Sequence, residues 1–241
     1  MPAWHEYPDL LLAHTTGFRV TGTPETVRRA FGAFLGTQPV DQRWFATGHR
    51  LRPYRCLLAA DGHTWLWTLP PATEAAHAWL DVAGAESITP EILPVPAEAR
   101  KLLLTLRTPI VPDGRVAGGR QGFLPPDPDR LVQSLAWRIT RLVKCYIDPS
   151  WVPDPVVVTG AHPLSADGAV VKAHHASTHH DGVFMGNGWV GSVLWEADPA
   201  WITHWWPWLV AGSIWGVGRG TAWGHASFDL TALTSGSLWS A

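Results

Sequence analysis

Apolar and polar residues repeat along this chain with two periods, one typical of strands and one typical of helices. Thr23 followed by Pro24 is a helix start signal, and Gly36 is a stop signal. Two apolar runs around an Asp-Gly pair indicate a hairpin. The first half is therefore predicted to contain a strand over 9–20, a helix over 23–36, a hairpin over 54–69 and a helix over 72–82.

The second half repeats this succession. Asp127 or Asp129 caps a helix that runs to Tyr146, with Leu131, Leu135, Ile139 and Leu142 on its apolar side and Arg130, Arg138, Arg141 and Lys144 on the other. Around it the pattern predicts strands over 101–111, 154–164, 168–177, 187–197 and 222–230, and a short helix that starts at Asp198 and Pro199.

Each half thus approximates β-α-β-β-α-β, with one extra strand in the second half. This is the split βαβ arrangement, and it predicts an α+β protein of two tandem ferredoxin-like (RRM-like) domains. Three prolines between residues 90 and 100 indicate the boundary, which gives domains over 1–95 and 100–241. The fold alone does not determine the activity.

The charge of the chain as a whole is nearly balanced, but two segments are locally basic. The formal net charge is -2 and the pI is near 6.6, so the chain is not a general binder of polyanions. Basic residues nevertheless outnumber acids over 100–146, and residues 43–55 contain arginines and no acid. Such segments predict a local nucleic-acid site, with a solvated basic face as the alternative.

The cysteines, the first residues and the most apolar stretch of the chain indicate where the protein is located in the cell. Cys56 and Cys145 lack the spacing of a disulfide framework or a zinc knuckle. The first residues do not resemble a signal peptide, and the most apolar stretch is too short to span a bilayer. These features predict a cytoplasmic protein.

The stretch SIWGVGRGTAWGHASF, residues 213–228, combines four glycines with one arginine. Glycines allow positive φ angles and let the backbone lie close to a bulky group, and successive bare amides can bind an anion. Arg219 is one of the last two cations of the chain. The segment is therefore predicted to bind phosphate.

Four ordered segments carry a resemblance to a known family. The glycine segment GVGRGTAWGHA, the strand LLLTLRTPIVPDG, the helix LVQSLAWRITRL and the strand NGWVGSVLWEA are similar to those of the CRISPR repeat-RNA endoribonucleases of the RAMP superfamily. The glycine segment departs from the family pattern at Ala226, where the last glycine is usual, at His225 and at Gly220.

The resemblance implies an enzyme that cuts precursor CRISPR RNA within its repeats without a metal ion or other cofactor. The ribose 2′-hydroxyl would attack the adjacent phosphorus and leave a 2′,3′-cyclic phosphate and a 5′-hydroxyl. His49 occupies the loop position of the family's catalytic histidine, with Tyr54 beside it. The predicted RNA-binding residues are Arg50, Arg52, Arg55, Arg130, Arg138, Arg141, Lys144, Gly216, Gly218, Arg219, Gly220, Thr221 and Gly224.

Two other interpretations remain open. RAMP subunits that bind guide RNA in a CRISPR effector complex without cutting it are similar in sequence, and they would also have Cas proteins as partners. The cluster of His174, His175, His179, His180 and Asp181 would suit a metallonuclease, although its spacing matches no metal-ligand pattern. Trp201, Trp205 and Trp208 are predicted to be core residues, with Trp223 as a candidate for base stacking.

Overall fold

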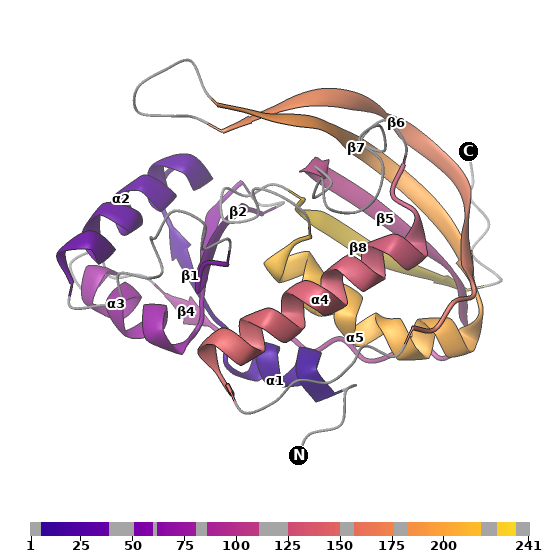
Figure 1. Cartoon of the computed structure of the whole chain (residues 1–241), viewed down its shortest axis with the longest axis horizontal. Coiled ribbons are helices and arrows are strands. Elements are labelled where there is room, and N and C mark those ends of the chain that lie inside the picture. The colour runs from indigo at the N-terminus through magenta and orange to yellow at the C-terminus, as the bar shows by residue number, and fades with distance from the viewer. Residues whose placement is uncertain are drawn as a thin grey trace.

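Two four-stranded antiparallel sheets organise the chain, one in each half (Figure 1). The structure is a computed structural model that describes residues 6–38, 51–59, 62–80, 86–110, 125–149, 157–175, 183–217 and 226–234. Its elements are α1 Tyr7–Ala13, β1 Thr16–Val20, α2 Pro24–Thr37, β2 Tyr54–Leu58, β3 Thr64–Thr68, α3 Pro70–Leu80, β4 Ser87–Ile88, β5 Ala99–Ile110, α4 Pro128–Tyr146, β6 Ala161–His175, β7 Val183–Ala197, α5 Pro199–Trp215 and β8 Phe228–Thr234.

The N-terminal sheet has the strand order β2-β3-β1-β4, and α2 and α3 pack against it. The Oγ1 atom of Thr23 accepts a hydrogen bond from the amide of Thr26, which confirms the predicted start of α2. Phe18, Phe31 and Leu66 lie in the buried cluster of this half. The predicted hairpin is formed by β2 and β3.

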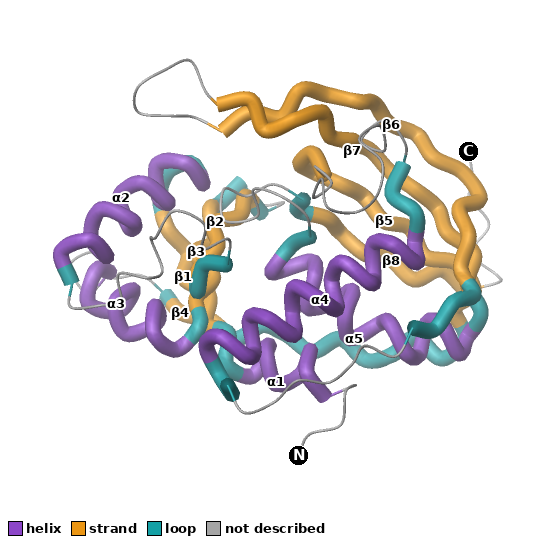
Figure 2. Tube along the Cα trace, in the orientation of Figure 1, coloured by secondary structure: helices purple, strands orange, loops and turns teal. Residues whose placement is uncertain are grey.

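The C-terminal sheet has the equivalent order β6-β7-β5-β8. Asp127 caps α4 by accepting a hydrogen bond from the amide of Arg130 at 3.0 Å. Helices α4 and α5 pack against each other, and the long β6–β7 hairpin arches away from them (Figure 2). Because both halves place the first strand next to the third and fourth, the predicted tandem ferredoxin-like fold is confirmed.

The prediction of a strand over 9–20 was wrong for its first part. Residues 7–13 form α1, which has a proline in its first turn and buries Tyr7, Leu11 and Leu12. A short apolar run does not distinguish a buried helix from a strand by periodicity alone. Helix α1 packs on α4 and α5, and it therefore belongs to the core of the C-terminal half.

The prediction of two strands over 154–164 and 168–177 was also wrong. A single strand, β6, runs from Ala161 to His175, and Gly168 lies inside it opposite Gly191 of β7. Gly191 has a φ of 138°, and a Cβ at either glycine would collide with the backbone of the partner strand. The glycine serves close strand approach, whereas the sequence suggested a break between strands.

The helix predicted to be short is 17 residues long. It contains Pro207 and is apolar all round, so it lacks both the amphipathic pattern and the continuity that identify a long helix. Trp201, Trp205 and Trp208 are fully buried, which confirms that they are core residues. The last strand starts at Phe228, later than the predicted 222.

Two further observations complete the fold. Cys56 and Cys145 are both free thiols, as predicted. Across the ranges that the structure describes, no helix has the length and apolar character needed to cross a membrane.

Candidate nucleic-acid interface

The glycine-rich segment joins α5 to β8, and the structure describes its two ends. Gly216 and Val217 follow α5, whereas Ala226 and Ser227 precede β8. Gly218, Arg219, Gly220, Thr221 and Gly224 lie outside the described residues. The amide of Ala226 donates to the carbonyl of Pro109 at 3.1 Å, and the amide of Ser227 donates to Thr108 Oγ1 at 2.8 Å. The far end of the segment is thus attached to β5.

Gly216 is buried and has φ 69° and ψ 177°, a combination that essentially only glycine adopts. A Cβ at this position would lie 2.8 Å from the Cζ atom of Arg55 and 2.9 Å from both of its terminal nitrogens. The backbone therefore lies directly against a guanidinium group. This close approach gives Gly216 a structural role, separate from the predicted contact with RNA.

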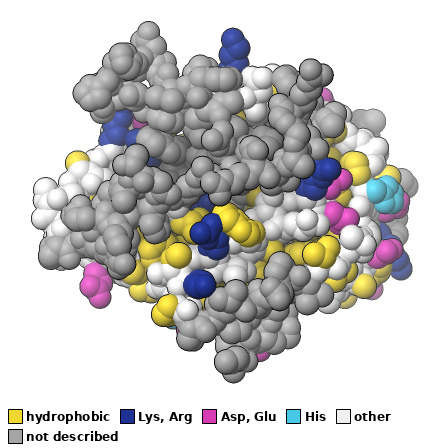
Figure 3. All heavy atoms as spheres, viewed as in Figure 1, with side chains coloured by type: hydrophobic (Ala, Val, Ile, Leu, Met, Phe, Trp, Pro, Cys, Tyr) yellow, Lys and Arg dark blue, Asp and Glu magenta, His cyan; other side chains and the backbone are white. Residues whose placement is uncertain are grey.

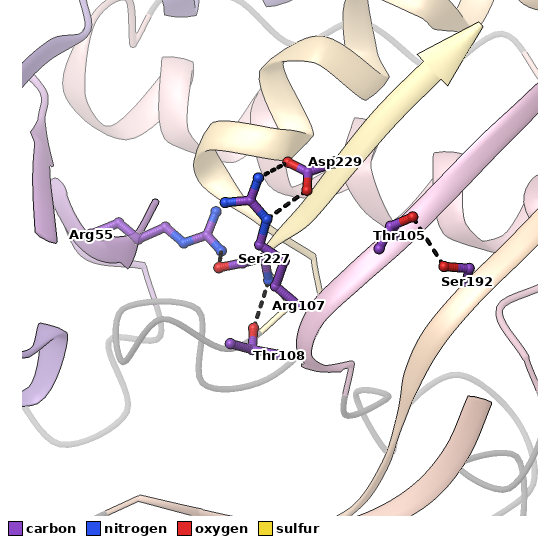
Figure 4. Close-up of polar contacts among 7 residues, drawn as sticks. All are labelled: Arg55, Thr105, Arg107, Thr108, Ser192, Ser227 and Asp229. Atoms are coloured by element: carbon purple, nitrogen blue, oxygen red, sulfur yellow. Dashed lines mark hydrogen bonds and ion pairs between the residues drawn. The ribbon is translucent and has the colours of Figure 1, made fainter. Parts of the chain in front are cut away.

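Arg55 reaches from β2 in the N-terminal half into the C-terminal half (Figure 4). Its guanidinium donates to the carbonyl of Ile214 and, at 3.2 Å, to Ser227 Oγ. The side chain is fully buried, and burial followed by the like charge of Arg138 lowers its pKa. Arg55 faces protein carbonyl and hydroxyl oxygens, an arrangement that differs from the exposed phosphate contact that its place in the sequence suggests.

Arg138 was predicted to lie on the basic face of α4, and this placement was wrong. Its side chain is 7% exposed, and its Nε donates to the carbonyl of Trp215 at 3.1 Å. Burial lowers its pKa. Arg138 follows Leu135 by three residues and Leu131 by seven, so it lies on the apolar side of the helix. Helical spacing alone would have placed Arg138 on the buried side of α4. The prediction assigned it to the basic face because arginine is charged.

Tyr54 was predicted to act beside His49. His49 and Arg50 lie outside the described residues. Tyr54 is 5% exposed, its ring packs edge-on against Phe31, and burial raises its pKa. A phenol in this environment stays protonated at neutral pH and is enclosed by the core of the N-terminal half.

Two arginines lie close to Tyr54. Arg52 is half-buried and Arg28 comes from α2, and the charge of each lowers the pKa of the Tyr54 hydroxyl, opposing the larger effect of burial. Arg28 was not among the predicted site residues. The arginines of 43–55 can be recognised as a group because they are close together in the sequence. Arg28 is distant in sequence and comes close to them only because α2 packs on β2.

Exposed basic residues lie along the outer face of α4. Arg130, Arg141 and Lys144 are exposed, as predicted, and Trp137 on the same face is 52% exposed. The guanidinium carbon of Arg141 lies 4.4 Å from the centre of a Trp137 ring, a cation–π geometry. Basic side chains are visible among apolar ones on the face along which α4 runs (Figure 3). This face combines cations with an accessible aromatic surface.

A cavity of about 270 Å³ lies between the two halves. Trp65 and Trp67 form one wall, whereas the other is built from the ends of β5, α5 and β8. The exposed Arg107 forms two hydrogen bonds of 2.5 Å to Asp229 at this wall. Ile214 and Ser227 line the cavity too, so its C-terminal wall includes the two residues to which Arg55 donates hydrogen bonds.

Within the part of the chain that the structure describes, no three His, Cys, Asp or Glu side chains gather into a possible metal site. His179, His180 and Asp181 of the predicted histidine cluster lie outside that part. The metal-binding interpretation of the cluster therefore stays a prediction.

An unusual backbone conformation at Ala226 leads to a stability prediction. Ala226 has φ 55°, in the left-handed region where a residue with a Cβ is strained by roughly 1 kcal/mol. We expect Ala226→Gly to raise the free energy of unfolding by about 0.5–1 kcal/mol, since it relieves this strain at the position where the RAMP family carries glycine. Thermal or urea unfolding measures the effect. A variant less stable than the parent would show that the buried methyl group contributes more than the strain removes.

Two repeated ferredoxin-like sheets, with a glycine-rich connection between the last helix and the last strand, form the arrangement that the family resemblance implies. The family model of the CRISPR-associated endoribonuclease Cas6 matches residues 104–225, half of the chain. The chain therefore belongs to the Cas6 family of CRISPR-associated endoribonucleases. Cas6 proteins process CRISPR RNA, and the sequence-based recognition of the family is confirmed.

Solved structures share the fold over nearly the whole chain. A Cas6 product complex (TTHA0078) has 17% identity and a TM-score of 0.54, covering 91% of this chain and 98% of that chain. Thermus thermophilus Cas6 (TTHB231) has 13% identity and a TM-score of 0.51, covering 90% and 97%. A partial Cas6-RT-Cas1–Cas2 complex has 8% identity and a TM-score of 0.57, covering 92% and 46%. A sequence search of curated proteins finds no significant match.

Proposed function

We propose that this protein cleaves precursor CRISPR RNA within its repeats, without a metal ion, to release mature guide RNA. Membership of the Cas6 family carries the proposal. The 2′-hydroxyl next to the scissile bond attacks the phosphorus in line, and the products carry a 2′,3′-cyclic phosphate and a 5′-hydroxyl. A group must accept the proton of the 2′-hydroxyl and another must protonate the leaving oxygen. Cations must offset the charge that develops on the phosphorane.

His49 is the proposed proton-transfer residue, because the ordinary pKa of histidine lies near neutrality. The buried Tyr54 hydroxyl lies beside Arg28 and Arg52 and is proposed to position the segment that contains His49. The glycine-rich segment, with Arg219, is proposed to bind the RNA backbone. The proposed mechanism thus places proton transfer in the N-terminal half and charge stabilisation in the C-terminal half.

RNA is the proposed substrate, and other Cas proteins are proposed as further partners. Solved structures with this fold include Cas6 product complexes and Cas6-RT-Cas1–Cas2 complexes. The outer face of α4 supports an RNA partner, because it joins exposed cations to the accessible ring of Trp137. Cations bind phosphates, and an exposed indole stacks on unpaired bases.

Incubation of the purified protein with repeat RNA in EDTA tests the proposal. Cleavage that yields a cyclic phosphate end supports it, as read by mass spectrometry of the 5′ fragment. Binding without cleavage would instead indicate a non-catalytic RAMP subunit. Cleavage that the chelator abolishes would indicate a metallonuclease.

The outer face of α4 leads to a prediction on RNA affinity. We expect Arg141→Ala to weaken repeat-RNA binding and to reduce the slope of log K against log salt by about one, since one phosphate contact is lost. Arg29→Ala is the matched control, because Arg29 is also an exposed helical arginine but pairs with Glu25 on α2. Titrations at several salt concentrations measure both slopes. Equal slopes for the parent and Arg141→Ala would remove this face from the RNA path.

A further inference from the structure

The guanidinium of Arg55 contacts both ends of the glycine-rich segment. One nitrogen donates to the carbonyl of Ile214, two residues before Gly216, and another donates to Ser227 Oγ, immediately after Ala226. Figure 4 shows the contact with Ser227. A planar guanidinium holds two acceptors at fixed angles, which a single ammonium group does not reproduce. One side chain therefore links the two ends of the segment.

Arg138 strengthens the attachment at the first end. Helix α5 ends at Trp215, and the last carbonyl oxygens of a helix lack partners within the helix. Arg55 donates to the carbonyl of Ile214, and Arg138 donates to the carbonyl of Trp215. Cations at a helix C-terminus are also favoured by the helix dipole. The two arginines together fix the last turn of α5, where the glycine-rich segment begins.

Burying two arginines side by side is energetically unfavourable, which argues that they do more than fill space in the core. Both side chains are buried, and burial lowers the pKa of each guanidinium because it disfavours the charged form. The charge of Arg138 lowers the pKa of Arg55 further. Two like charges close together in a protein interior oppose folding unless their hydrogen bonds are satisfied. An apolar side chain would fill the same space without the cost of burying a second positive charge.

The two arginines come from different halves of the molecule. Arg138 lies on α4, next to α5 in the same half, whereas Arg55 lies on β2 of the N-terminal sheet. Arg55 also follows the segment of the proposed proton-transfer residue, His49, by six positions in the sequence. Its hydrogen bonds therefore link the strand that follows His49 to both ends of the glycine-rich segment.

We propose that Arg55, assisted by Arg138, is a positioning residue that holds the two ends of the glycine-rich segment in register with the N-terminal half. The clamp, defined as Arg55, Arg138, Ile214, Trp215, Gly216 and Ser227, acts through hydrogen bonds and packing within the protein. It sets the placement of the RNA-binding segment relative to the residues that transfer protons. The consequence for catalysis rests on the proposed function, whereas the structural role of the clamp does not.

Arg55→Lys tests the clamp, because lysine retains the charge but cannot span both acceptors. Hydrogen exchange by mass spectrometry reads the amide of Gly216, which donates to the Gly212 carbonyl, and the amide of Ser227, which donates to Thr108. We expect exchange at both amides to accelerate at least tenfold in the variant. We also expect single-turnover cleavage of repeat RNA to fall at least tenfold, with KM nearly unchanged.

Two controls separate positioning from general loss of stability. Arg107→Lys changes an exposed arginine bound to Asp229, close to Ser227 but without contact to the α5 carbonyls, and it should leave exchange and cleavage unchanged. Val132→Ala removes buried atoms from α4 and lowers Tm without touching the clamp. Exchange and cleavage are compared at temperatures equally far below each Tm. If Arg55→Lys does not fold, Arg138→Lys takes its place, with exchange at Gly216 as the measurement.

Parental exchange at both amides in Arg55→Lys would overturn the proposal, and so would equal acceleration in Val132→Ala. Faster exchange with parental cleavage would overturn it as well, since the clamp would then have no effect on the reaction. If the parent itself does not cleave repeat RNA, the proposed function fails, and the exchange measurements alone decide whether the clamp holds the segment. The two proposals therefore fail in distinguishable ways.

Discussion

We expect Gly216→Ala to lower the free energy of unfolding by about 3 kcal/mol. A φ of 69° with a ψ of 177° costs a residue with a Cβ on the order of 1–3 kcal/mol. The new methyl carbon would also meet the Arg55 guanidinium at 2.8 Å, and overpacking of a buried site typically costs about 1–3 kcal/mol. Urea unfolding followed by circular dichroism measures the loss.

Gly36→Ala is the matched control for this substitution. Gly36 lies in α2 with nothing within 4 Å of an added Cβ, and it has no positive φ. Alanine favours a helix over glycine by about 1 kcal/mol, so this variant should be as stable as the parent or more stable. If Gly216→Ala unfolds at the parental urea concentration, Arg55 and the backbone move apart easily, and the packing described for the clamp does not constrain the segment.

The second large effect concerns catalysis. We expect His49→Ala to reduce single-turnover cleavage of repeat RNA by at least 100-fold, about 2.7 kcal/mol in activation free energy. Affinity for the RNA should remain nearly parental, because the imidazole acts mainly in the transition state. Rapid-quench cleavage assays and a separate binding titration measure the two quantities.

His77→Ala provides the comparison, since His77 is exposed on α3 and packs against Phe18, within the N-terminal half. It should cleave at the parental rate. Unchanged cleavage by His49→Ala would exclude this histidine from proton transfer.

Much of the fold could be predicted from local patterns, because caps, turns and amphipathic stripes act over a few residues. The helix caps at Thr23 and Asp127 and the hairpin of β2 and β3 are present as predicted. Two of the errors concern apolar segments: the short leucine run of α1, and α5, which is apolar all round. Periodicity vanishes there, and only contacts with distant elements distinguish helix from strand or long from short.

The site was harder to predict for a related reason. Arg55 and Arg138 are charged residues in basic surroundings, and such residues usually lie at the surface. Their burial depends on the carbonyls at the end of α5, more than 70 residues away in sequence from either arginine. The sequence indicated that Gly216 must lack a Cβ so that the backbone can approach a phosphate. In the structure the group that lies against Gly216 is the buried guanidinium of Arg55.

The position of α1 has a consequence for the order in which the chain folds. This helix precedes the N-terminal sheet in the chain, yet its buried face packs on α4 and α5, and Thr15 just after it accepts a hydrogen bond from Trp215 at 3.0 Å. The N-terminal sheet and its two helices can assemble early from contacts between neighbouring elements. Helix α1 must wait, with Leu11 and Leu12 exposed, until some 200 further residues have been synthesised. Completion of the C-terminal core is therefore a late, long-range step, of the kind that slows folding.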